Sequence, residues 1–338
     1  MRPPPQRSEG ADLCCTTGNA RCRTVGHEKE TQHPTERPRC GSYGLMYLSV
    51  ASPKGTDMEP IENAQLQRTN IGALIASRLR DNLDDARRQW QENAPVNHFF
   101  IDDVLPEALA MTIRRGFPDA STMMLRKSLR ELKYVSAQMN HHAPILEEAL
   151  YAFQEPEVVK LVSQITGLSS LDPDERLYAG GISMMGLGHF LNPHLDNSHD
   201  KDRQRYRVLN LLYYVSPGWR AENGCNLEVW PEGTKGEPVT IVSKFNRLAV
   251  MVTNQHSWHS VSPNLSSEAR CCVSNYYFSS QPVGDTEYFH PTSFRGRPEQ
   301  RVRDVVLRAD ATARGLVRKV FPNGVVENKH VYHKETNE

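Results

Sequence analysis

The chain has 338 residues, of which 38% are hydrophobic and 24% charged, a composition typical of a globular protein with a sizeable core. Its 40 basic residues balance its 40 acidic residues, so it lacks the positive field that nucleic acid or an anionic membrane would attract. It also has no apolar run of about eighteen residues, the length that a membrane span needs. We therefore expect a soluble protein with no nucleic-acid or membrane partner, and the sequence leaves its oligomeric state open.

Residues 1–58 differ from the rest, being rich in Pro, Arg, Thr, Gly and Cys with few regularly recurring apolar positions. We interpret them as a disordered N-terminal extension, or as a stretch upstream of a truer start at Met58. Their four cysteines lack the paired spacing of a zinc site. The positively charged N-terminus has no apolar stretch behind it, which argues against a secretory signal. The odd total of seven cysteines favours a reducing, cytoplasmic location.

Residues 59–170 are predicted to be mainly helical with one short strand. Apolar residues recur at helical spacing from Ile71 to Trp90, with Asn70 as the expected N-cap and Pro95 beyond the helix end. The segment HFFIDDV predicts the strand, and residues 106–117 and 144–167 predict further helices.

Residues 171–282 change to short apolar strands separated by turn signals such as Pro217-Gly218 and Asn223-Gly224. Many short strands at close spacing are typical of an antiparallel sandwich or barrel. Residues 283–338 return to a helical pattern, with an apolar set that includes Val302, Val305 and Leu307. The predicted fold is therefore mainly β with flanking helices.

The motif His194-Leu195-Asp196 places an imidazole and a carboxylate two positions apart, on one face of an extended strand. Both side chains can then reach one metal ion, and His259 is the expected third ligand. Two histidines and one carboxylate form the facial triad of non-haem Fe(II) oxygenases, which leaves three coordination positions for cosubstrate and O2. An isolated H-x-D arises by chance in many proteins, so the surrounding sequence must decide whether this one binds a metal.

That context lies downstream. His256 is the rival third ligand, but only His259 stands in the sequence His259-Ser260-Val261, directly after an apolar strand. Arg270 follows eleven positions (270 − 259) beyond His259 and opens another strand. A guanidinium at that place can pair through two hydrogen bonds with the far carboxylate of a keto-diacid.

Together these residues resemble the 2-oxoglutarate/Fe(II)-dependent oxygenase superfamily, most closely its prolyl-hydroxylase-like branch. The resemblance covers residues 95–282 and rests on H-x-D, a glycine-containing hairpin, H-x-V and the downstream arginine, in that order. It implies a double-stranded β-helix, or jelly-roll, core over residues 171–282. It also implies Fe(II) on His194, Asp196 and His259, with 2-oxoglutarate and O2 as cosubstrates and ascorbate as a further candidate.

Arg270, together with Ser274, would hold 2-oxoglutarate in this interpretation. Two positions depart from the family pattern. The hairpin has Cys225 after Gly224 where a second glycine is usual, and Cys272 stands where a serine is frequent. The tyrosines Tyr213, Tyr214, Tyr276 and Tyr277 are interpreted as core or barrel-lining residues.

The resemblance implies a dioxygenase that hydroxylates an unidentified substrate and releases succinate and CO2. The substrate could be a protein residue, an amino acid or a small metabolite, and desaturation or ring closure would use the same ligands. The alternative from another class is a non-oxidative, cupin-like metal-binding protein, which has no need for Arg270. A halogenase of the same superfamily would lack the carboxylate, whereas Asp196 is present.

A chain that begins at Met58 is expected to fold and to keep its activity, because residues 1–58 show no core-forming periodicity. The measurements are the yield of folded protein, iron binding and turnover, compared with the full chain. Loss of folding or of iron binding in the shortened chain would contradict this interpretation of the N-terminal segment.

Overall fold

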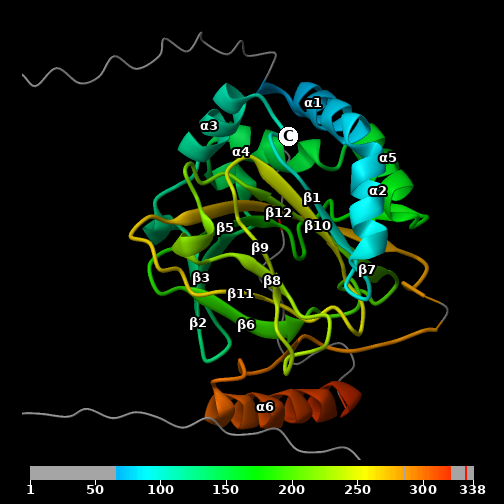
Figure 1. The fold of residues 1–338 in the computed structure, drawn as a ribbon, viewed down its shortest axis with the longest axis vertical. Helices are drawn as coiled ribbons and strands as arrows, with labels where there is room; N and C mark the ends of the chain where they lie inside the picture. Colours follow the sequence, from blue (N-terminus) through cyan, green and yellow to red (C-terminus); the bar gives the residue numbers. More distant parts are fainter. Residues whose placement is uncertain (1–65, 285, 321–331, 333–338) are drawn as a thin grey trace, which may run out of the picture. The chain divides into compact units, whose positions relative to one another are not determined.

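The structure, a computed structural model, describes residues 66–284, 286–320 and 332. They lie in a unit that spans Asp57–Glu338 (Figure 1). The predictions for residues 1–58, including the absence of a zinc site and the start at Met58, fall outside the described residues. The domain boundaries at 58, 170 and 282 stay predictions.

The helices of the described part surround a single sheet. They are α1 Arg68–Asp81, α2 Leu83–Glu92, α3 Glu107–Arg115, α4 Pro144–Ala152, α5 Pro156–Thr166 and α6 Arg301–Val320, with short 3-10 turns at Ala120–Thr122, Met139–His141 and Ala221–Asn223.

The strands form one 13-stranded sheet within the described residues, and all the pairings are antiparallel. They are β1 His98–Ile101, β2 Met124–Lys127, β3 Glu131–Ser136, β4 Leu171–Pro173, β5 Gly181–Met185, β6 Phe190–Leu195, β7 Tyr206–Tyr214, β8 Leu227–Val229, β9 Val239–Ile241, β10 Arg247–Val252, β11 His259–Val261, β12 Arg270–Ser279 and β13 Ser293–Phe294.

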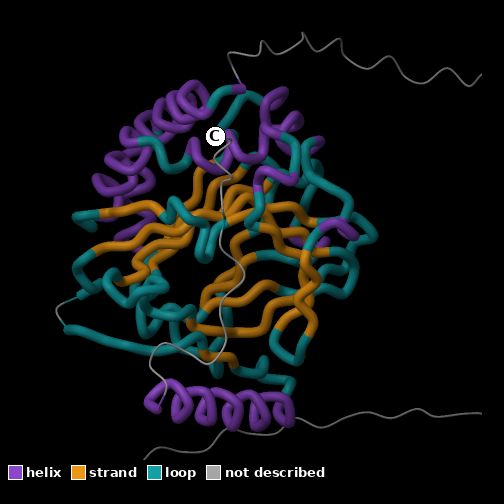
Figure 2. The backbone as a smooth tube through the Cα atoms, turned by 180° about the vertical axis from the view of Figure 1, so that it is seen from behind, coloured by secondary structure: helices purple, strands orange, loops and turns teal. Residues whose placement is uncertain are grey.

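The sheet is curled into two facing layers (Figure 2). One layer runs β1-β10-β7-β12-β5, the other runs β6-β11-β8-β9, and β3 joins them by pairing with both β5 and β6. This arrangement is the jelly roll that the resemblance implied, in a mainly β fold with flanking helices. Closing the layers through β3 leaves their inner faces opposite each other, which is where a barrel of this size holds a ligand.

Helices α1 to α5 lie on the outer side of the first layer (Figure 1). Helix α1 packs against α4 and α5, α2 packs against β1, and α4 packs against β12. Their apolar faces and the outward side chains of the layer form one buried core that includes Ile75, Leu150, Phe153 and Tyr213. Helix α6 instead lies beside β13, next to the second layer.

The predicted single helix from Ile71 to Trp90 is wrong in one respect, because it is two helices that meet at Asn82. There the backbone leaves helical geometry, with φ −111° and ψ 14°. The Asn82 side-chain amide donates to the Arg78 carbonyl at 2.8 Å and so competes with the backbone for that acceptor. The N-cap is Gln67 rather than Asn70. The helical periodicity itself is confirmed, since Ile71 and Trp90 are buried.

The prediction of one strand between residues 59 and 170 is also wrong, because β1, β2 and β3 all lie there. The β2–β3 hairpin gives little sequence signal, since most of its side chains are exposed or half-buried and several are charged. Its strand conformation depends on pairing with β5 and β6, a tertiary effect that outweighs local propensity. The predicted strand at 98–104 is confirmed for its first part, β1.

The C-terminal tail is not purely helical within the described residues, because β13 precedes α6 and pairs with β6. The expected apolar face of α6 is only partly buried: Leu307 is buried, whereas Val302 and Val305 are exposed. Of the described helices, none combines the length and the apolar character that crossing a bilayer requires.

The turn before β10 ties the sheet to the β1–α3 connection through Asn246, which is buried and has φ +62°. Its side-chain oxygen accepts hydrogen bonds from the Leu105 amide at 3.1 Å and the Tyr213 hydroxyl at 2.7 Å. Its side-chain amide donates to the Leu105 carbonyl at 2.6 Å. Asparagine suits this site because it tolerates the left-handed conformation and both donates and accepts.

Asn246→Ala is expected to lower the free energy of unfolding by about 3 kcal/mol, because three side-chain hydrogen bonds are lost in a buried place. Asn246→Asp keeps the acceptor but buries a carboxylate that faces the Leu105 carbonyl, so it should also be destabilising. Urea unfolding measures the change, with Asn140→Ala as the control because Asn140 is exposed. Equal stability of Asn246→Ala and the control would contradict this role.

Candidate metal centre

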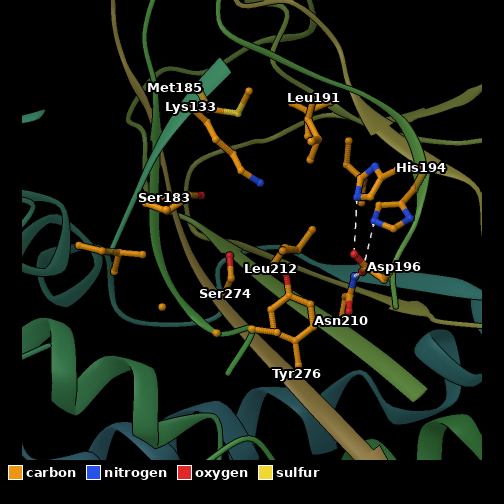
Figure 3. Close-up of a pocket in the computed structure, with 18 of the residues that line it drawn as sticks. Lys133, Ser183, Met185, Leu191, His194, Asp196, Asn210, Leu212, Ser274 and Tyr276 are labelled. Atoms are coloured by element: carbon orange, nitrogen blue, oxygen red, sulfur yellow. Dashed lines mark hydrogen bonds and ion pairs between the residues drawn. The ribbon is translucent and has the colours of Figure 1, made fainter. Parts of the chain in front are cut away.

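The pairing of β6 with β11 brings His194 opposite His259 in the second layer. The two imidazole centroids are 4.1 Å apart. Asp196 lies just beyond the last residue of β6 and projects toward the same place (Figure 3). One antiparallel strand pair therefore brings together two histidines that are 65 positions apart along the chain (259 − 194).

The potential ligand atoms converge on one point. His194 Nε2 lies 3.6 Å from Asp196 Oδ1, and His259 Nε2 lies 3.6 Å from Asp196 Oδ2. One ligand atom from each of the three residues lies within 4.8 Å of the other two. This spacing suits a single ion bound by two imidazoles and one carboxylate.

Both imidazoles are oriented by backbone carbonyls. Nδ1 of His194 hydrogen-bonds to the Asn192 carbonyl at 3.0 Å, and Nδ1 of His259 to the Ser257 carbonyl at 2.9 Å. If each Nδ1 carries the proton, each Nε2 lone pair faces the centre, as metal-binding histidines require. Burial, together with the neighbouring His259 and against the opposing effect of Asp196, lowers the pKa of His194 to about 3. His194 is therefore neutral at pH 7 and able to bind a metal.

Asp196 is held by two residues of β7. The Asn210 amide donates to Asp196 Oδ2 at 2.9 Å, and an Arg207 guanidinium nitrogen lies 3.1 Å from the same oxygen. Burial alone would raise the pKa of Asp196, but Arg207, followed by the two histidines, holds it below its usual range. The carboxylate is thus ionised, and its Oδ1 is the oxygen left for a metal.

The remaining candidate histidines lie elsewhere. His256, the rival third ligand, is exposed in the turn before β11. His189 packs against Tyr134 and His199 against Tyr206. The described residues thus bring together the three predicted ligands and leave the rival outside the group.

A cavity of about 120 Å³ opens from these residues between the two layers, and its lining also includes Arg270 and Ser274. Arg270 is the first residue of β12 and only 3% exposed. Its guanidinium lies over the Tyr214 ring at 4.8 Å, 3.4 Å from Ser243 Oγ and 3.9 Å from Met185 Sδ. No carboxylate among the described residues forms an ion pair with it within 4.0 Å.

Ser274 and Tyr276 follow Arg270 on the same face of β12 and line the cavity (Figure 3). The Ser274 hydroxyl lies 3.6 Å from the Cys272 thiol. The predicted cosubstrate residues Arg270 and Ser274 therefore share one cavity with the predicted metal ligands. Tyr213, Tyr214 and Tyr277 are fully buried, as expected of core residues.

Sequence reasoning missed Arg207, Asn210 and Lys133 as residues of the site. Asn210 and Arg207 gave a usable signal, because each interrupts the apolar run of β7, where a buried polar group needs a partner. Lys133 gave none, because β3 itself was not predicted.

The sequence profile of the 2OG-Fe(II) oxygenase superfamily matches residues 180–278. This segment therefore belongs to that superfamily, which confirms the resemblance seen in the sequence. Membership implies an oxygenase that depends on Fe(II) and 2-oxoglutarate. The matched range contains the H-x-D motif, His259 and Arg270, and the charge and spacing of the three converging side chains fit Fe(II).

Several solved structures resemble the chain. A prolyl-4-hydroxylase from Pseudomonas putida is 17% identical, with 62% of this chain and 100% of that chain covered and a TM-score of 0.43. A prolyl 4-hydroxylase from Phytophthora capsici is 16% identical, with coverage of 62% and 65% and a TM-score of 0.44. The carbocyclase SnoK from nogalamycin biosynthesis is 14% identical, with coverage of 73% and 94% and a TM-score of 0.44.

By their names, two of these three proteins are prolyl hydroxylases and one is a carbocyclase. No curated protein matches the chain at a significant level.

His194→Ala, Asp196→Ala and His259→Ala are each expected to abolish Fe(II)-dependent turnover of 2-oxoglutarate. Removing a ligand should weaken metal binding by more than the roughly 10–100-fold that loss of an outer partner costs. His256→Ala is the matched control and should keep most of the activity. Metal titration and succinate formation provide the two measurements. Full activity in His259→Ala with loss in His256→Ala would show that the third ligand is wrongly assigned.

Proposed function

We propose that the protein is an Fe(II)- and 2-oxoglutarate-dependent dioxygenase that hydroxylates an unidentified substrate. His194, Asp196 and His259 hold the metal in this proposal, and Arg270, with Ser274, holds 2-oxoglutarate. The products are the hydroxylated substrate, succinate and CO2.

The observation that carries the proposal is the state of Arg270. A guanidinium that is 3% exposed and has no carboxylate partner among the described residues is costly unless a ligand supplies the negative charge. It lines the same cavity as the three candidate metal ligands. A keto-diacid fits both the metal site and Arg270, because its keto-acid group can chelate a metal while its far carboxylate pairs with the guanidinium.

The bound metal would supply the activation of O2 and the oxidising power. The chain's own residues hold the metal-binding side chains in position and shape the cavity. Asn210 and Arg207 hold the carboxylate of Asp196, the backbone carbonyls of Asn192 and Ser257 hold the imidazoles, and apolar walls such as Leu191 and Leu212 limit water in the cavity.

The rival proposals explain less of this arrangement. A cupin-like metal protein has no use for the unpaired guanidinium of Arg270 at one side of the cavity. A halogenase needs the carboxylate position vacant, whereas Asp196 stands beside both histidines. Hydroxylation is therefore the proposed outcome, and product analysis in a succinate-formation assay with a panel of substrates would distinguish it from desaturation or ring closure.

Arg270→Ala is expected to weaken 2-oxoglutarate binding by some tens to thousands of fold, because a buried charge pair is worth on the order of 2–5 kcal/mol. Metal affinity should hardly change, since the metal needs only its three ligands. Arg270→Lys should fall between wild type and Arg270→Ala because an ammonium keeps the charge but loses the two-point geometry.

Anaerobic calorimetry of the metal-loaded proteins measures the effect, with Arg115→Ala as a control on an exposed arginine. Equal affinities of wild type and Arg270→Ala would remove Arg270 as the anchor. Absence of 2-oxoglutarate binding to the wild type would refute the proposed function itself.

A further inference from the structure

A second pocket, here called the α6 pocket, lies where α6 begins at Arg301. Its volume is about 500 Å³, larger than that of the cavity beside the candidate metal ligands. Five cationic side chains and one carboxylate line it, namely Lys235, Arg295, Arg297, Arg301, Arg308 and Asp304. A hollow with this surplus of positive charge attracts anions.

The sheet separates the α6 pocket from the cavity. His259 lines the cavity, so its neighbour Ser260 turns to the opposite face of the sheet. There the Ser260 hydroxyl donates to Glu228 at 2.6 Å, and Glu228 accepts from both terminal nitrogens of Arg297, at 2.6 and 3.2 Å. Because Arg297 lines the α6 pocket, this pocket lies on the outer face of the second layer.

The carboxylate of Asp304 organises the wall of the α6 pocket. It accepts hydrogen bonds from Arg295 Nε at 2.7 Å and from the Gly296 amide at 3.0 Å, and Arg308 Nε lies 3.0 Å from it. Glycine permits the close approach at position 296, because a Cβ there would lie 2.7 Å from the Asp304 nitrogen. The one carboxylate of the lining is therefore already shared between two guanidinium groups.

Four donors of the lining lack a counterpart. Lys235 and Arg301 are exposed and have no carboxylate within 4.0 Å among the described residues. Thr234 is only 8% exposed, and its hydroxyl has no hydrogen-bond partner in the described part of the chain. Nε of the buried Arg297 likewise has no partner there. A ligand with negative charge and several hydrogen-bond acceptors fits these donors.

We propose that the α6 pocket is a second ligand site, which binds the phosphate group of a phosphate monoester. Such a group carries about two negative charges and offers three acceptor oxygens, so it can accept hydrogen bonds from several sides at once. Arginine, the most frequent cation of this lining, pairs with phosphate through two parallel hydrogen bonds. The free backbone amides and the dipole at the start of α6 also favour an anion.

The test uses the full, Fe(II)-loaded chain without O2 and two sources of phosphate monoester. Glycerol 2-phosphate is the dissolved probe, measured by calorimetry. Vesicles of phosphatidylcholine with phosphatidic acid present the same group on a lipid, and sedimentation measures binding to them.

The variants are Lys235→Gln, Arg301→Gln and the two combined, because both side chains are exposed and take no part in the ion pairs of the wall. Lys127→Gln and Arg115→Gln are the matched controls, since both residues are exposed cations outside the pocket. Melting temperatures show whether each variant is folded.

Each single substitution is expected to weaken phosphate binding roughly three- to fivefold, as for an exposed ion pair, and the double substitution roughly tenfold or more. The two controls and Arg270→Ala should bind as the wild type does, because Arg270 lies in the cavity on the other face of the sheet. Binding of glycerol 2-phosphate assigns the site to a soluble phosphoester. Binding to the vesicles alone, with loss in the double variant, assigns it to a lipid head group.

Absence of binding to both probes would overturn the inference. Binding that survives in the double variant, or that Arg270→Ala removes, would also overturn it, because the phosphate would then lie outside the α6 pocket. None of these results depends on 2-oxoglutarate, so they leave the proposed function to its own test.

Discussion

The site depends on one strand pairing, that of β6 with β11. Because His194 and His259 are directly opposite in this pair, two imidazoles meet without any contribution from loops. A shift of one residue in this register would turn one imidazole to the other face of the sheet. Two neighbouring contacts depend on that register. The Phe294 ring stacks on His194, with the ring centroids 5.1 Å apart, and Asn210 holds Asp196 by a hydrogen bond.

The curl of the sheet provides the second requirement. The candidate ligands lie in one layer and Arg270 lies in the other, so they share a cavity only because β3 joins the layers at their edge. The same strand also contributes Lys133 to the lining of the cavity. The buried, unpaired guanidinium opposite a cluster of metal-binding side chains is a costly arrangement in the absence of a dianionic ligand.

Much of the site could be predicted from the sequence, because the separation of His194 and Asp196 has a direct geometric meaning in an extended chain. The sequence favours His259 over His256 because only His259 stands in an H-x-V pattern, and the structure places His256 at the surface. The β6–β11 register could not be predicted, since it depends on contacts between distant segments. For the same reason β3 and Lys133 could not be predicted. The helix break at Asn82 is a local side-chain effect, which apolar periodicity does not detect.

The central claim is that metal and 2-oxoglutarate bind in one cavity and contact each other. The most direct test is the linkage between the two, measured by calorimetry without O2 on the full chain with and without a divalent metal. The account predicts that the metal strengthens 2-oxoglutarate binding, and that 2-oxoglutarate strengthens metal binding by the same factor. Equal affinity for 2-oxoglutarate in the metal-free and metal-loaded protein would contradict it.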